Sequence, residues 1–176
     1  MKSKGLSLIT TLVYVGLLAL VLAVATRLTA GLLHANAQAQ LAGEVIDNAQ
    51  SALATITQEI QQADGVYTPT SLLNATPGQL SLATRHNLPT DETITYVDFY
   101  VDDQHLYVKR EGSAGSLITS PRVKISHLEF THLNSASPYP AVRIAATFAA
   151  DVPDSKVVTQ TSIALTKTIS LRAYSL

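Results

Sequence analysis

The chain has 176 residues, a length that fits one domain or one domain with an extension. It contains no cysteine, which excludes a disulfide framework, a zinc ribbon and a thiol nucleophile. The net charge is −1, so the basic surplus typical of nucleic-acid-binding proteins is missing and no nucleic-acid partner is expected. All 7 prolines lie at or after Pro69. This asymmetry predicts one long helix followed by a different kind of structure.

The N-terminus has the pattern of a membrane helix. Residues 1–5 are short and basic, and no charged residue occurs from Leu6 to Ala25. About 20 apolar residues cross the bilayer core, so this segment is predicted to span it. A secretory signal peptide begins in the same way, but its apolar region is shorter and ends at a small-residue cleavage site, so we expect a retained helix. Because Lys2 and Lys4 precede the segment, the positive-inside rule predicts a cytoplasmic N-terminus and a C-terminal domain outside the membrane.

Residues 26–64 continue the helical pattern with one polar and one apolar face. Apolar residues recur at steps of three and four, which is the period of an amphipathic helix. Gly65 is predicted to stop this helix, and Gly16, Gly31 and Gly43 to loosen it without breaking it. The stripe predicted to pack on the rest of the domain consists of Leu41, Val45, Ala49, Leu53, Ile56, Ile60 and Ala63.

From residue 65 the apolar pattern changes to a period of two, which predicts strands joined by turns. Asp102–Gln104 is predicted to be a hairpin turn and Glu111–Ser116 a loop. Strands with no helical pattern between them indicate an antiparallel sheet, which the helix stripe is available to cover, so the fold class is α+β. The predicted strands are 79–84, 93–101, 105–110, 123–133, 142–150 and 157–174.

No arrangement of residues predicts catalysis or metal binding. The closest histidines, His127 and His132, are five apart on a predicted strand, so they point to opposite faces and have no evident carboxylate partner. The acidic pairs Asp102-Asp103 and Asp151/Asp154 lack the ligand spacing of a calcium loop and are interpreted as turn residues. We therefore expect no enzyme activity and no cofactor.

The residues at the N-terminus resemble the class III signal of type IV pilins and pseudopilins. Residues 4–13 are KGLSLITTLV: the basic leader ends in Gly, and a hydrophobic residue, Ser, Leu and Ile follow. Two further segments are similar to minor pilins related to the J-type pseudopilin. They are residues 56–66, ITQEIQQADGV, and residues 117–130, LITSPRVKISHLEF.

The resemblance implies a type IV pilin-like fold, in which a long membrane-spanning helix packs on a C-terminal antiparallel sheet. It implies that a prepilin peptidase cuts between Gly5 and Leu6 and methylates the new amine of Leu6. The implied partners are other pilins or pseudopilins, the peptidase, an inner-membrane assembly platform and membrane lipid. The implied parts are a leader (1–5), a transmembrane assembly helix (6–25), its amphipathic continuation (26–64) and a sheet domain (65–176).

One position departs from the family pattern. The family has a nearly invariant Glu as fifth residue of the mature chain, and here that residue is Thr10. The expected function is therefore a minor pilin or pseudopilin of a type IV pilus-like or type II secretion filament, with the tip as the favoured position. The alternative is a membrane-anchored extracellular binding or adhesion module that never polymerises.

Overall fold

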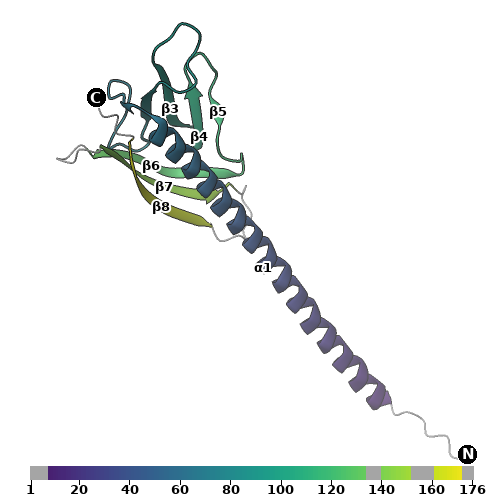
Figure 1. Ribbon diagram of the computed structural model, residues 1–176. Helices are drawn as coiled ribbons and strands as arrows, with labels where there is room; N and C mark the ends of the chain where they lie inside the picture. Colours follow the sequence, from purple (N-terminus) through teal and green to yellow (C-terminus); the bar gives the residue numbers. More distant parts are fainter. Residues whose placement is uncertain (1–7, 134–139, 152–160, 172–176) are drawn as a thin grey trace, which may run out of the picture. The chain divides into compact units, whose positions relative to one another are not determined.

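The computed structural model describes residues 8–133, 140–151 and 161–171 (Figure 1). Helix α1 (Leu8–Gln62) is 55 residues long, which corresponds to about 82 Å at 1.5 Å per residue. The chain divides into two compact units, residues 1–40 and 41–176, and α1 contributes to both. The helix runs without interruption through Gly16, Gly31 and Gly43, so their loosening within a filament stays a prediction.

The free space around Gly43 makes a stability prediction possible. A Cβ added there meets no atom within 4 Å, so Gly43→Ala gains helix propensity without a clash and should stabilise the second unit by about 1 kcal/mol. At Gly78 the added Cβ lies 3.1–3.3 Å from three backbone carbonyl oxygens, so Gly78→Ala should destabilise it. Urea unfolding of a shortened chain that begins at Ala37 measures both changes. A loss of stability in Gly43→Ala would contradict the prediction.

The strands form two antiparallel sheets. The first has five strands in sequence order: β1 (Gly65–Val66), β2 (Leu80–Thr84), β3 (Thr95–Asp102), β4 (His105–Arg110) and β5 (Ser116–Leu117). The second has three strands: β6 (Val123–Leu133), β7 (Ala141–Ala150) and β8 (Ser162–Ser170). The predicted α+β layout, a long apolar N-terminal helix packed on antiparallel strands, is confirmed. The prediction of a single sheet is wrong.

Several element ends differ from the sequence predictions. The predicted hairpin between β3 and β4 is confirmed, but its loop is Asp103-Gln104, both with positive φ, because Asp102 pairs with His105 at the end of β3. The predicted loop 111–116 ends one residue earlier, because Ser116 pairs with Val108 and belongs to β5. The last strand, β8, runs from Ser162 to Ser170 and is therefore shorter than the predicted strand 157–174. Residues 157–160 and 172–176 lie outside the described residues.

The end of the helix also differs from expectation. Gly65 is not a helix cap but the first residue of β1, where it pairs with Ala83. The Asp64 amide already donates to the Ala83 carbonyl at 2.8 Å, so pairing with β2 draws the chain away from the helix after Gln62. Hydrogen bonding to a neighbouring strand therefore replaces the predicted glycine stop.

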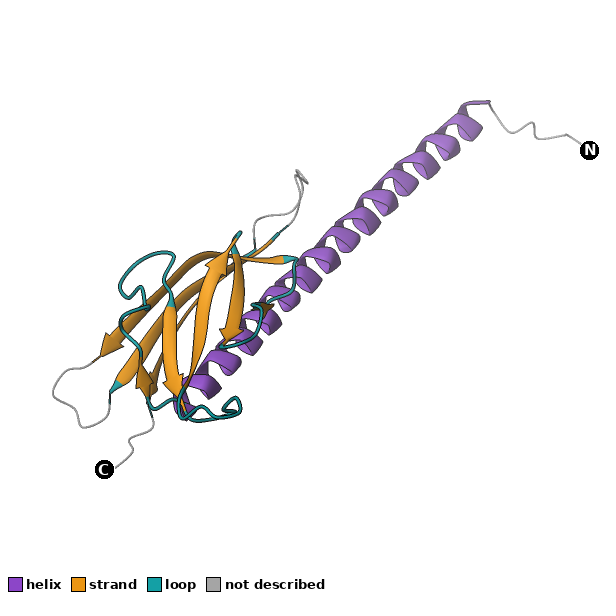
Figure 2. Cartoon of the chain, turned by 90° about the horizontal axis from the view of Figure 1, so that it is seen from above, coloured by secondary structure: helices purple, strands orange, loops and turns teal. Residues whose placement is uncertain are grey.

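The second part of α1 lies along the strands of the second unit, as both Figures 1 and 2 show. Of the predicted stripe, Leu41 is only half-buried. Ala52, which the predicted stripe omitted, is completely buried. The stripe residues buried in the core are Val45, Ala49, Leu53, Ile56, Ile60 and Ala63.

Two carboxylates of this helix, and a third just after its end, pair with arginines of the sheet unit. Glu44 contacts Arg122 at 3.1 Å, Asp64 contacts Arg85 at 3.3 Å, and a third pair joins Glu59 to Arg110. The arginine side chains are 48–66% exposed, so each pair contributes no more than about 1 kcal/mol. The pairs of Glu44 and Glu59 join α1 to the sheet unit and so restrict the rotation of the helix, whereas Asp64 lies just after the helix end.

Backbone hydrogen bonds join the second sheet to the first along β6. The Ile125 amide donates to the Gln104 carbonyl at 2.7 Å, which attaches the β3–β4 turn. The Gly78 amide donates to the Leu128 carbonyl at 2.8 Å, and the Asn74 amide to the Phe130 carbonyl, also at 2.8 Å. The edge of β6 is therefore covered by the turn and by the loop before β2, which protects it from pairing with another chain.

Candidate functional site

The first unit has an apolar surface with no cover. Between Leu8 and Leu33, 15 large apolar side chains are 51–80% exposed, and Arg27 is the only charged residue of that stretch. The helix is long and apolar enough to cross a membrane. Apolar residues occur on every face, which is typical of a helix surrounded by lipid or by other helices rather than of a surface helix.

Thr10 lies on this exposed helix, in its first described turn. Two other threonines of α1, Thr26 and Thr29, donate their hydroxyls to the carbonyls four residues earlier, at 2.8 and 3.0 Å. The corresponding carbonyl for Thr10 belongs to Leu6. Leu6 and Gly5, the two residues of the predicted cleavage site, lie outside the described residues.

The five-stranded sheet carries an aromatic group on the face opposite to the helix. Four of the chain's 7 tyrosines lie there. The ring centroids of Tyr67 and Tyr96 are 4.7 Å apart. The rings of Tyr100 and Tyr107 are stacked, with centroids 5.7 Å apart. We name this the tyrosine surface: Tyr67, Tyr96, Tyr100 and Tyr107, with Asp98 and Lys109 between them.

The alternation of β3 and β4 creates the tyrosine surface. On β3, Val97 and Phe99 are buried toward the helix. Because side chains alternate along a strand, Tyr96, Asp98 and Tyr100 face the opposite side. The register of the hairpin then sets Asp98 opposite Lys109. Tyr67 joins the surface from the end of β1, because its amide donates to the Ser81 carbonyl at 2.8 Å. The sequence analysis did not find this cluster, although the period of two and the hairpin turn contain the signal.

Gly115 packs its backbone against the tyrosine surface. A Cβ placed there would lie 2.4 Å from the Tyr100 hydroxyl oxygen, so Gly115→Ala forces that ring to move and should cost about 1 kcal/mol. In a Tyr100→Phe background the same change should cost almost nothing, because the clashing atom is gone. A double-mutant cycle measured by urea unfolding tests this coupling. Equal costs in the two backgrounds would show that the hydroxyl is not the constraint.

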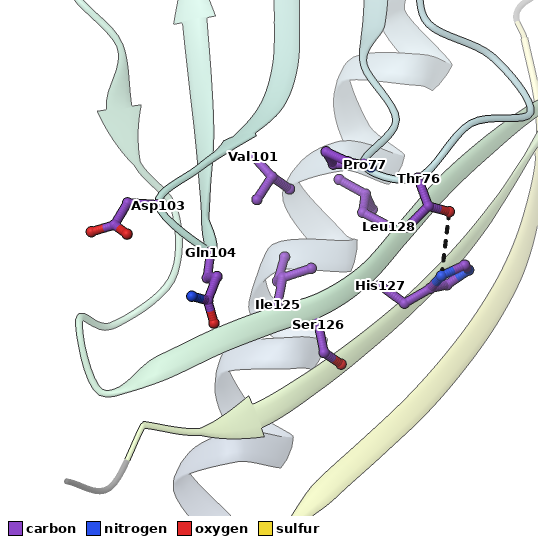
Figure 3. A pocket seen from close by; sticks show the side chains of 9 residues that line it. All are labelled: Thr76, Pro77, Val101, Asp103, Gln104, Ile125, Ser126, His127 and Leu128. Carbon is purple, nitrogen blue, oxygen red and sulfur yellow. Dashed lines mark hydrogen bonds between the residues drawn. The ribbon is translucent and has the colours of Figure 1, made fainter.

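A hollow of about 260 Å³ lies beside the bulge of β6 (Figure 3). Its floor is apolar, and at one side the Thr76 hydroxyl and His127 Nδ1 are 3.4 Å apart. Asp103 points away from the other side chains. Asp103 and His127, the ionisable residues of the hollow, therefore do not form a pair. It is lined by Thr76, Pro77, Val101, Asp103, Gln104, Ile125, Ser126, His127 and Leu128.

The histidines and the acidic turns can now be compared with their predictions. The expectation that His127 lacks a carboxylate partner is wrong, because its Nε2 lies 3.7 Å from a Glu129 oxygen two residues further along the same face. His132 has a buried Nε2 with no hydrogen-bond partner in the described structure. Asp151 pairs with Lys124 at 2.8 Å, and Asp154 lies outside the described residues. No cluster of three His, Asp or Glu side chains suited to a metal occurs among the described residues.

Comparison with known proteins gives no relative on which to base a function. No family model matches the chain, and neither the curated proteins nor the solved structures include a match. The function must therefore be inferred from the exposed helix, the sheet unit and the N-terminal residues themselves.

Proposed function

We propose that the chain is a minor pilin or pseudopilin, a structural subunit of a type IV pilus-like or type II secretion filament. The observation that carries the proposal is the uncovered apolar surface between Leu8 and Leu33 on a helix that continues into the core of a folded sheet unit. Apolar surface of this extent is stable only in lipid or against other apolar helices. A filament subunit needs both environments in turn, the membrane before assembly and neighbouring helices after it.

The N-terminal residues supply the second support. A retained membrane anchor has no need of the leader-like sequence that ends in Gly5, whereas a subunit of the pilin class is cut there to expose the amine of Leu6. In this proposal the leader is removed on the cytoplasmic side by a prepilin peptidase. The helix then stays in the membrane, with the sheet unit outside, until the assembly platform adds the subunit to the filament.

The mass of the intact protein from its native membrane tests the proposal. We expect the loss of residues 1–5 and the gain of one methyl group on Leu6. Gly5→Val should retain the leader and block assembly, because the peptidase requires a small residue at the cut. Gly16→Val is the matched control, since an added Cβ there meets nothing within 4 Å and processing should be normal. An uncut leader in the unsubstituted protein would overturn the proposal and favour a permanently anchored binding module.

A further inference from the structure

We propose that the tyrosine surface is a binding site for an uncharged saccharide. This proposal goes beyond filament assembly and is independent of it, because the surface lies wholly within the second unit. At the end of the surface formed by Tyr67 and Tyr96 is a hollow of about 270 Å³, just below the usual range for small-molecule sites, and Tyr100 and Tyr107 do not line it. The residues that line the hollow are Tyr67, Thr70, Tyr96, Asp98, Lys109, Glu111 and Gly112.

The aromatic pair provides a platform for the apolar face of a sugar ring. Tyr67 and Tyr96 are tilted by 51° at a centroid distance of 4.7 Å, so the two rings contact each other and leave no space for a cation between them. Both rings line the hollow. Tyrosine is well suited to this task, because it presents a large rigid surface with little loss of side-chain entropy on binding.

The polar groups of the hollow are available for hydroxyl groups. Asp98 and Lys109 are directly opposite each other on β3 and β4, yet neither makes an ion pair within the described part of the chain. The carboxylate can accept and the ammonium can donate hydrogen bonds to neighbouring hydroxyls of one sugar. Glu111 is already engaged, because its Oε2 accepts from the Tyr96 amide at 3.2 Å, and this bond holds the aromatic platform in place.

The charge of the site selects among ligands. Two carboxylates, from Asp98 and Glu111, outnumber the single ammonium of Lys109, so phosphate, sulfate and sialic acid groups are disfavoured. A protein partner is also less suited, because the cores of protein interfaces are depleted of charged residues, whereas here charges lie at the centre of the aromatic group. A neutral sugar satisfies the exposed charges through its hydroxyls and brings no repulsion.

A glycan array tests the proposal with the full chain in a detergent that has no sugar head group. The array carries neutral oligosaccharides and their sialylated and sulfated counterparts. We expect binding to at least one neutral glycan, with the sialylated form of that glycan bound at least tenfold more weakly. Because the chain has no tryptophan, intrinsic tyrosine fluorescence then gives the dissociation constant for the same glycan in solution.

Variants locate the binding on the surface. Tyr67→Ser and Asp98→Asn should each weaken binding at least tenfold, while Tyr67→Phe should stay within threefold because the platform is kept. Asp47→Asn removes an exposed helix carboxylate far along the chain from the site and should have no effect. Unchanged thermal unfolding shows that each variant is folded.

Three results would overturn the proposal. They are no binding to any neutral glycan, binding to acidic glycans alone, and equal binding by the unsubstituted chain and the Tyr67→Ser variant. If no neutral glycan binds and Tyr67→Ser instead abolishes the recovery of a co-assembled protein from the native membrane, the surface is a protein interface and the saccharide proposal is wrong.

Discussion

Replacement of Ile56 and Ile60 by Asp is expected to abolish folding of the second unit. Both isoleucines lie on α1 and are 1% and 0% exposed, among the apolar side chains of the core. A carboxylate at either position loses its hydration and finds no partner, at a cost of several kcal/mol each. Two such changes exceed the net stability of a typical domain, which is about 5–15 kcal/mol.

The measurement uses a shortened chain that begins at Ala37. This fragment retains all of the second unit and omits the uncovered apolar residues, so we expect it to be soluble and to unfold cooperatively. Circular dichroism and urea titration of the double variant should show no folded baseline.

The same helix offers a matched control. Ile46 is 38% exposed, so Ile46→Asp introduces the same charge on the same element where water can still reach it. Its cost should be less than about 1 kcal/mol. A folded double variant, or a loss of folding in the Ile46→Asp control as well, would show that burial of the helix stripe is not what holds the unit together.

The helix was the part of the fold most accessible to prediction. Its apolar stripe repeats at steps of three and four, and that period alone selects the face that packs on the strands. The stripe nevertheless omitted Ala52, which is fully buried. Alanine is common on both faces of a helix, so its burial depends on how closely the strands approach, which is a tertiary property that the period does not contain.

The division of the strands into two sheets could not be predicted from the local sequence pattern. Strand alternation predicts which residues face inward, but the partner of each strand depends on contacts distant in sequence. The break falls between β5 and β6, where Ser116–Leu117 pairs for only two residues before the chain leaves the sheet. The ion pairs Glu44–Arg122 and Glu59–Arg110 are unpredictable for the same reason, since their members are more than 50 residues apart.

The tyrosine surface could be predicted from the sequence only in part. The turn at Asp103-Gln104 fixes the register of β3 and β4, and that register places Asp98 opposite Lys109 and Tyr100 opposite Tyr107. These pairs follow from the two-residue turn, whereas the predicted turn over residues 102–104 would set Asp98 opposite Val108. The approach of Tyr67 to Tyr96 does not, because it depends on the pairing of the two-residue strand β1 with β2.

If the chain is a filament subunit, as proposed above, replacement of Thr10 by Glu is expected to change its position in the filament. An ionisable group within a bilayer costs several kcal/mol unless it is paired. In the pilin class a Glu at this position is thought to pair with the N-terminal amine of a neighbouring subunit, which draws a new subunit beneath those already assembled. Thr10 carries no charge, and a hydroxyl in a helix can donate to a carbonyl of its own chain, as Thr26 and Thr29 do.

Under the proposed function, a subunit with Thr10 enters the membrane at little cost and offers no attraction to the amine of a preceding subunit. The amine of its own Leu6 can still accept a Glu from the next subunit. This asymmetry favours a first place in assembly, at or near the filament tip, with few copies per filament. Immunogold labelling of the sheet unit should then mark filament ends, and Thr10→Glu should add labels along the shaft because the variant can dock beneath other subunits.

Thr11→Glu is the control that separates the position of the charge from the charge itself. It places the same carboxylate one residue further on, about 100° around the helix, where it cannot reach the amine that a Glu at position 10 would meet. We expect the Thr11→Glu subunit to be lost from filaments, because the charge stays unpaired in the membrane. Uniform labelling of the shaft by the unsubstituted protein would contradict the tip assignment, since it would show that helix packing alone admits a subunit without the Glu.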